Sequence, residues 1–531
     1  MSWPPKPFYS QSMVWPLPPV RPGELEMSAP QPPPLQRGGH LVDLPPLTPG
    51  LVNCDTRLSE SAPVEQQANL FGDAISFRSS TKKSAESDTS SINRLPFELL
   101  SEIFILSLPP VDRAWMFGET IDAQEGRRSP NIPSHLRAPA VLTAVCAYWS
   151  AVATGTPRLW TRILVDDLCA RRQLHWAALH VRNSGNLPLI LHIRTNPGSP
   201  HLALDALLRI IVPHAQRWHT LVLFANSLKV GDAIFLSTAR AESLSSIMVH
   251  GVRSDIRDTI WSWAMSSPHL RQVSLTLANN NILRLVSQAP DIWQDLRELS
   301  LLNRNCRTPE VLMLFQTCPR MEVLHVDSLG WPRLPDDGDL SVTQAPNLHT
   351  LMVVNRADDT HTFFSHILVP RLRHLAIDDH ASHANSHLRR QLWSAATDML
   401  AKSGARLERF LYTGDEEQLV KLLQRGTFQD LKELSAYRML TSKRLLNLLT
   451  VHSGHCCLPF LNDLSVGCTW GATEAALDKM IMSRKGSLHI LQFWCLIYPI
   501  DLTVLKRASA DWLAVYFVET PYEWNSSSTS S

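Results

Sequence analysis

The feature that most constrains this chain is a six-residue pattern, apolar-x-x-apolar-x-apolar, which recurs eleven times between residues 218 and 493. Successive copies start 26, 26, 26, 25, 27, 24, 35, 24, 30 and 27 residues apart. The copies begin at Trp218, Leu244, Leu270, Leu296, Met321, Leu348, Leu372, Leu407, Leu431, Leu461 and Leu488. So regular a step predicts one structural unit repeated along the chain, each adding a strand to a shared sheet.

The segments between the copies favour helices. Thr308-Pro309-Glu310 is typical of a helix start, with a cap residue, a proline in the first turn and an acid near the positive end of the dipole. Helical apolar spacing also runs through residues 387–400, 416–423 and 443–449. Strands alternating with helices predict an α/β chain with parallel strands.

This pattern resembles leucine-rich repeats, in which each unit is a strand plus a helix. The resemblance implies a curved solenoid over residues 185–520, with a parallel sheet backed by helices. The repeats are irregular, because the Asn or Cys expected at the ninth position of each unit is absent. Asn303, Asn355 and Cys468 lie at the eighth position instead.

Because side chains alternate across a strand, the residues flanking the second and third apolar positions should face a concave, exposed surface. That surface is predicted to include Gln272, Ser274, Glu298, Ser300, His325, Asp327, His374, Asp378, Glu433, Tyr437, Gln492 and Trp494. We expect a target protein to bind there, with Tyr and Trp as anchors. The candidate target-binding residues are His325, Asp327, His374, Asp378, Tyr437 and Trp494.

Two helices are predicted ahead of the repeats, over residues 92–108 and 139–153. In the first, Pro96 suits the first turn, and Leu99, Ile103 and Leu106 form an apolar stripe at i, i+4 and i+7. The second is apolar nearly all round. Short helices with this much apolar surface need a partner to complete their core.

The order of residues in this region resembles an F-box, and the variant found in mushroom-forming fungi looks nearest. The resemblance covers residues 92–163 and rests on Leu-Pro-x-Glu-Leu-Leu-x-x-Ile-Phe from residue 95, Val-Cys-x-x-Trp from residue 145 and Thr-Pro-x-Leu-Trp from residue 156. An insert at about 110–138 separates the first two helices, where the family has a short turn.

The F-box resemblance implies binding to a Skp-type adapter and, through it, to a cullin of an SCF-type ubiquitin ligase. The chain would then be the substrate receptor, without catalytic residues of its own. The positions that match the family's docking and packing residues are Leu95, Pro96, Leu99, Ile103, Val145 and Trp149. The alternative is a leucine-rich-repeat scaffold whose F-box-like segment only caps the solenoid.

Four regions are therefore expected along the 531 residues. They are a Pro/Ser-rich disordered tail at 1–90, the helical module at 91–165, the repeats at 185–520 and a second disordered tail at 521–531. The first tail holds fourteen of the 37 prolines within its first 50 residues. Such segments bury too little apolar surface to offset the entropy of ordering.

Composition narrows the choice of partner and compartment. Lys plus Arg total 50 and Asp plus Glu total 49, so charge gives no reason to expect nucleic acid or an anionic membrane. The sequence has no signal peptide and no apolar stretch long enough to span a membrane. Nine unpatterned cysteines favour reduced thiols in the cytoplasm or nucleus.

Motifs for phosphate cradles, nucleotide folds, serine nucleophiles and kinases are missing from the sequence. The best metal candidate is His380, His383 and His387, which would share one face if helical. Cys456, Cys457 and Cys468 lack regular ligand spacing and favour buried thiols. We expect no metal, cofactor or catalysis, with a metal-dependent enzyme built on the histidines as the remaining alternative.

Overall fold

The computed structural model describes residues 91–108, 138–166, 170–195, 201–225, 228, 230–250, 254–275, 286, 290–331, 340–355, 360–379, 386–436, 441–452, 456–467, 474–494, 508 and 512–518. The expected tails, the insert, Tyr437, His380, His383 and Cys468 lie outside these ranges. The chain divides within one helix into two units, of which one ends at Leu100 and the other contains residues 101–531.

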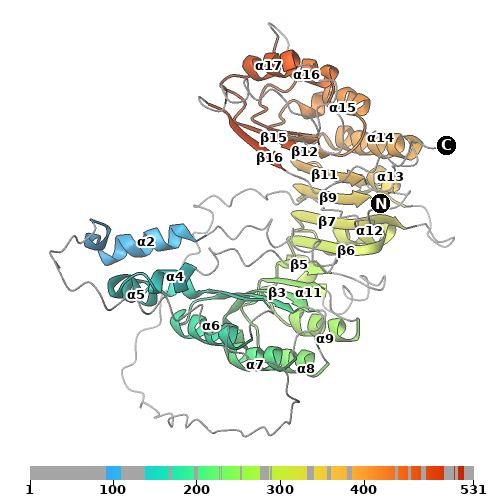
Figure 1. Cartoon of the computed structure of the whole chain (residues 1–531). Helices are drawn as coiled ribbons and strands as arrows, with labels where there is room; N and C mark the ends of the chain where they lie inside the picture. Colours follow the sequence, from blue (N-terminus) through green and yellow to red (C-terminus); the bar gives the residue numbers. More distant parts are fainter. Residues whose placement is uncertain are drawn as a thin grey trace, which may run out of the picture. The chain divides into compact units, whose positions relative to one another are not determined.

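One parallel sheet of fourteen strands organises the larger unit (Figure 1). Neighbouring strands follow one another in chain order, and every pairing in this sheet is parallel. The strands are β1 Arg162–Asp166, β2 Leu189–Thr195, β3 Trp218–Ala225, β4 Ser246–His250, β5 Gln272–Leu275, β6 Glu298–Arg307, β7 Val323–Trp331, β9 Thr350–Asn355, β11 His374–Asp379, β12 Arg409–Tyr412, β13 Glu433–Ala436, β14 Asp463–Val466, β15 Ile490–Trp494 and β16 Ala514–Val518. Two short strands, β8 Thr343–Gln344 and β10 Ile367–Leu368, pair separately.

Helices connect the strands, as parallel pairing requires. Ahead of the sheet lie η2 Ser91–Arg94, α2 Phe97–Ser107, α4 Ala138–Thr143, α5 Ala147–Thr154 and η4 Pro157–Trp160. Between strands lie α6 Ala170–Asn183, α7 His201–Ile211, η5 Val212–Arg217, α8 Val230–Ser237, α9 Ser254–Ala264, α11 Pro290–Asp295, α12 Thr308–Thr317, α13 Thr360–Ser365, α14 Ser386–Ser403, α15 Glu416–Leu423, η7 Gly426–Phe428, α16 Lys443–Leu449 and α17 Glu474–Ser483.

All eleven predicted strands exist and lie side by side in chain order, so the leucine-rich-repeat type of solenoid is confirmed. The sheet also extends beyond the eleven motifs, with β1 and β2 ahead of them and β16 after them. β1 begins at Arg162, directly after η4 and well before the predicted start of the repeats at residue 185.

The core lies between the helices and one face of the sheet. Within each strand, alternate residues are fully buried, such as Leu221 and Leu223 in β3 or Ile247 and Val249 in β4. They belong to one continuous apolar cluster that also contains helix residues, for example Ile260 in α9. The inward-facing residues of the strands therefore pack against the apolar faces of the helices in one shared core.

A buried polar network lies at the ends of β9 and β11. Asn355 at the end of β9 donates from Nδ2 to Asp379 Oδ1 at 2.8 Å and accepts from Thr360 Oγ1 at 2.6 Å. Arg389 Nε lies 3.3 Å from the other oxygen of Asp379, whose backbone N–H donates to Thr413 Oγ1. Asn355, the polar residue at the eighth position, thus provides hydrogen-bond partners for the buried polar groups between β9 and α13.

Two local predictions were wrong. The helix expected at 139–153 is two helices, because Cys146 adopts an extended backbone and its Sγ accepts from Trp149 N at 3.4 Å, which caps α5. Thr308 is not the cap of α12: Arg307 holds that position without a side-chain hydrogen bond, and Thr308 is the buried first helical residue.

Arg484 is buried at the end of α17 and joins two repeats. Its Nε donates to the carbonyl of Leu449, the last residue of α16, at 2.6 Å, and its Nη1 donates to the Leu458 carbonyl at 2.9 Å. Leu458 has φ of +88°, a conformation that L-residues rarely adopt. The guanidinium therefore fixes a strained turn from inside the core.

Arg484→Ala should lower the free energy of unfolding by about 3 kcal/mol, because two charge-assisted hydrogen bonds are lost and two carbonyls stay buried. The midpoint of urea unfolding, followed by circular dichroism, measures this. Lys485→Ala, at an exposed neighbouring position, is the control and should change the midpoint little. Equal shifts for both variants would contradict the role given to Arg484.

Candidate interaction surfaces

The helical module ahead of the sheet is held by two aromatic contacts. Phe104 of α2 packs on Trp149 of α5 with ring centroids 4.9 Å apart, and Trp160 Nε1 donates to the Ala153 carbonyl at 2.7 Å. Thr156 Oγ1 donates to the Val152 carbonyl at 2.7 Å. The Thr-Pro-x-Leu-Trp segment therefore anchors α5 to the start of β1.

Helix α2 has one buried face and one exposed apolar face. Leu100 and Phe104, four residues apart, are 0% and 1% exposed. Leu99, Ile103 and Leu106 follow the predicted stripe and are 55%, 43% and 81% exposed. A helix that exposes three large aliphatic side chains in series leaves apolar area for a partner to cover.

Helix α4 and the turn after it expose further apolar surface. Val141 is 56% exposed and Val145 is 54% exposed. Among the described residues, seven of the twelve exposed large hydrophobic side chains lie between residues 92 and 145. The other five lie singly in the repeats. Exposed large apolar side chains are therefore concentrated in the helical module of the described chain.

The six predicted adapter-binding residues are placed differently by the structure. Leu99, Ile103 and Val145 are exposed large hydrophobics, as docking positions need to be. Pro96 is exposed and opens α2 by accepting from Leu100 N, whereas Leu95 is half-buried. Trp149 is half-buried against Phe104 and holds α5 in place. Leu106 and Val141 were missed, although Leu106 completes the i, i+4, i+7 stripe.

The second surface is the face of the sheet that the helices leave open. Strand register aligns its side chains into rows that cross neighbouring strands. One row runs through Ser274, Ser300, His325, Met352 and Ala376. Neighbouring strands lie about 4.8 Å apart, so side chains within a row touch.

Histidines in these rows are neutral at physiological pH. Burial lowers the pKa of His250 to about 3, and those of His325 and His374 to about 4. The three rings lie 3.5 Å from Ser274 Oγ, 3.2 Å from Ser300 Oγ and 3.1 Å from Thr350 Oγ1, respectively. They present hydrogen-bonding groups without charge.

A charged cluster occupies the open face at β12 to β14. Arg409 Nη2 lies 2.8 Å from Glu433 Oε1, and the next residue in the row is Asp463. Burial raises the pKa of Glu433 to about 7, opposed by Arg409 and reinforced by Asp463. Burial likewise raises the pKa of Asp463. Glu433 therefore lies between a cation on β12 and a second acid on β14.

Oppositely charged residues alternate from strand to strand at the position immediately before each strand begins. Glu408 lies 3.4 Å from Arg373 and 2.9 Å from Lys432, and Glu322 lies 3.3 Å from Arg297. These pairs are exposed to different degrees and contribute little stability each. Together they form a charged border along the sheet, which a partner surface of complementary charge can contact.

The predicted target-binding residues share this face only in part. His325 and Asp327 of β7 and His374 of β11 are half-buried, whereas Asp378 is 7% exposed. Ser274 and Ser300 are each 3% exposed, so the expectation of a uniformly exposed face was wrong. Trp494 is in β15, but its side chain, like Tyr437, lies outside what the structure describes. Arg409 and Asp463 were missed.

Two further searches concern membrane and metal. Within the described ranges, no helix is both long and apolar enough to cross a bilayer. Across the same residues, no group of three His, Cys, Asp or Glu side chains converges as metal ligands. Cys306 and Cys318 are buried free thiols, and burial raises the pKa of each to about 12. Neither thiol is activated for nucleophilic chemistry.

Comparison with known proteins finds likeness among solved structures. No family model matches the sequence, and no curated protein is similar to it. Among solved structures, the chain is similar to one in the crystal structure of the Rad7 and Elc1 complex in yeast, with 12% identity and a TM-score of 0.33. That likeness covers 79% of this chain and 94% of the other.

If burial raises the pKa of Glu433 to about 7 from its usual 4.5, folding takes up a proton here between those pH values. The free energy of unfolding should then fall as pH rises through this window, and Glu433→Gln should remove that part of the slope. Urea midpoints between about pH 5 and about pH 8 measure it. Glu417→Gln is the control, because Lys421 lowers the pKa of exposed Glu417 and places its titration below the window. Parallel curves for wild type and Glu433→Gln would refute the assignment.

Proposed function

We propose that this chain is the substrate receptor of a cullin–RING ubiquitin ligase of the SCF type. The helical module binds a Skp-type adapter, and the open face of the sheet binds a target protein. The observation that carries the proposal is the gathering of exposed apolar side chains in the segment whose sequence resembles an F-box. Binding of a protein partner would remove this apolar surface from water.

The adapter surface is assigned from exposure and chemistry together. Ile103, Leu106, Val141 and Val145 supply aliphatic area, and Leu99 belongs to the same stripe of α2 as Ile103 and Leu106. Glu102 of α2 and Arg158 of η4 form an exposed ion pair at 3.4 Å, which gives the apolar area a polar border. An apolar centre with a polar border is the usual composition of a protein interface.

The target surface is assigned from the open rows of the sheet. The neutral His325 and His374 and the cluster of Arg409, Glu433 and Asp463 offer directional hydrogen bonds and charge. These groups stand on paired strands and need no folding on binding. Pre-organisation lowers the entropic cost of binding a protein target.

In this proposal the chain holds the target close to the conjugating enzyme and performs no chemical step itself. The adapter and cullin would hold the conjugating enzyme, while the sheet presents a lysine of the target. We therefore propose a non-catalytic role in the cytoplasm or nucleus. The alternative, a repeat scaffold with a capping helical segment, draws on the burial of Leu159 and Trp160 directly before β1.

Replacing Ile103 and Val145 together with alanine should weaken capture of a purified Skp-type adapter about thirtyfold or more, because interface anchors typically contribute ~2 kcal/mol or more. The fold should be kept, since both side chains are largely exposed. Dissociation constants from biolayer interferometry measure the effect, with Leu95→Ala/Pro96→Ala as a second pair.

The matched control is Val342→Ala/Phe460→Ala, which truncates two side chains that are 57% and 59% exposed in the repeats. This pair should leave the dissociation constant unchanged. Absence of adapter binding by the wild-type chain would favour the capping scaffold.

Asp327→Lys should reduce target capture and leave adapter capture intact, because β7 lies in the sheet and not in the helical module. Reversing a charge in a complementary surface puts like charges together and weakens binding severalfold or more. Proteins recovered with the full chain, quantified by mass spectrometry, give the measurement. Glu417→Lys on the helix side is the control. Identical protein sets from wild type and Asp327→Lys would remove β7 from the target surface.

A further inference from the structure

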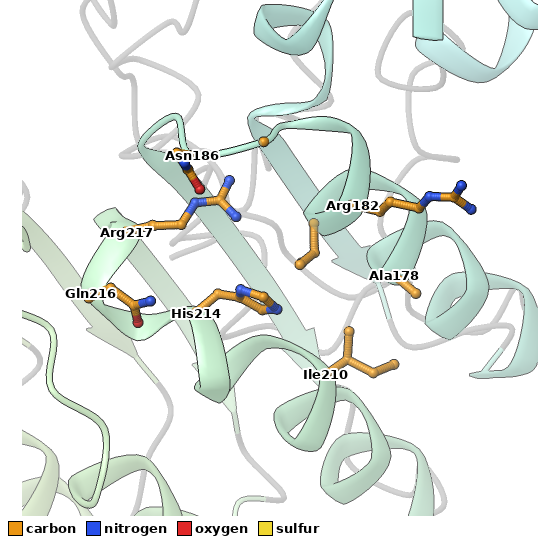
Figure 2. Close-up of a pocket in the computed structure, with 9 residues that line it drawn as sticks. Ala178, Arg182, Asn186, Ile210, His214, Gln216 and Arg217 are labelled. Atoms are coloured by element: carbon orange, nitrogen blue, oxygen red, sulfur yellow. The ribbon is translucent and has the colours of Figure 1, made fainter. Parts of the chain in front are cut away.

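A cavity of about 520 Å³ lies on the helix side of the first repeats, away from the surfaces assigned above. It is bounded by the end of α6, the loop that follows it, the end of α7 and η5 (Figure 2). Its size falls in the range of small-molecule sites, about 300–1,000 Å³.

The lining of the cavity is cationic on one side and apolar on the other. Arg217 and His214 come from η5, with Asn186 and Gln216 beside them, and Arg182 lies at the rim on α6. No acidic residue lines the cavity, and within the described residues neither Arg217 nor His214 forms an ion pair. Ala178, Val181 and Ile210 make the apolar side.

Arg217 is held in place by the loop after α6. Its Nε donates to the Leu187 carbonyl at 3.0 Å, and its Nη2 donates to Ser184 Oγ at 2.6 Å. The loop can approach because Gly185, two residues after the end of α6, adopts the left-handed region with φ of +58°. Figure 2 shows the guanidinium beside Asn186, with Arg182 directed elsewhere. Arg217 therefore presents its remaining donors without further loss of side-chain freedom.

His214 adds a second polar group near Arg217. Figure 2 shows its ring turned into the space between Arg217 and Ile210. Burial lowers the pKa of His214, and the positive charge of Arg217 lowers it further. An anion in the cavity would offset both effects and would accept from the ring and the guanidinium together.

We propose that this cavity binds a small organic oxyanion, a carboxylate or phosphate monoester carried on a compact apolar body. The anionic group pairs with Arg217 and His214, and the apolar body covers Val181 and Ile210. Carboxylate and phosphate each offer two oxygens that a guanidinium contacts through two parallel hydrogen bonds. Ligand binding would tie α6 to η5, and so join the first two repeats.

Isothermal titration calorimetry of the full chain tests the site with four probes: benzoate, phenyl phosphate, inorganic phosphate and phenol. Benzoate or phenyl phosphate should bind, and comparison of the two assigns the oxyanion. Inorganic phosphate and phenol should each bind at least about tenfold more weakly, because each lacks one half of the recognised chemistry. Equal binding of inorganic phosphate and phenyl phosphate would overturn the apolar half of the proposal.

Three variants and one control locate the binding. Ala178→Trp fills the cavity from an exposed helix position and should abolish binding while the chain stays folded. Arg217→Gln should weaken binding about tenfold or more, and Arg217→Lys less, since the charge is kept without the two-donor geometry. Arg209→Gln, outside the lining, should stay within about twofold of wild type. Undiminished binding by Ala178→Trp, or no binding of any organic anion by wild type, would refute the site.

Discussion

The structure depends on in-register parallel pairing of fourteen consecutive strands over one apolar core. Each strand places alternate residues such as Leu324 and Val326 against helices, and these residues belong to a cluster that runs from Ile163 to Leu513. The opposite face of the sheet is buried at β3 and β4, where Val222, Phe224 and Met248 form a second apolar cluster, and half-buried at His325 and His374. Side chains on that face meet in rows across strands, and each row is only as well defined as the register.

The strand order was predictable from sequence because its signal is local. A period of two in each strand, repeated at a step near 26 residues, is set by residues such as Leu351 and Val353 regardless of their distant neighbours. The outer strands β1, β2 and β16 were missed, although β1 and β16 carry the pattern, as Trp160, Ile163 and Val165 and as Trp512, Val515 and Phe517. The break at Cys146 was missed because a cysteine cap depends on one backbone conformation and not on composition.

The two surfaces differ in how far sequence predicts them. Exposure of Ile103 and Leu106 could be predicted, because the apolar stripe of this short helix is too wide to be buried against one neighbour. Burial of Ser274 and Ser300 did not follow, because it depends on side chains of neighbouring strands, such as His250 of β4 and His325 of β7. The pairing of Arg409 with Glu433 likewise needs the register of β12 and β13, which no spacing within one strand reveals.

Hydrogen–deuterium exchange of the full chain, with and without a saturating Skp-type adapter, tests the central proposal most directly. Adapter binding should slow exchange in α2 and from α4 through α5, where the exposed apolar side chains lie, and leave the strands of the sheet unchanged. Unchanged exchange in those helices, or protection confined to the open face of the sheet, would contradict the assignment of the helical module as the adapter-binding surface.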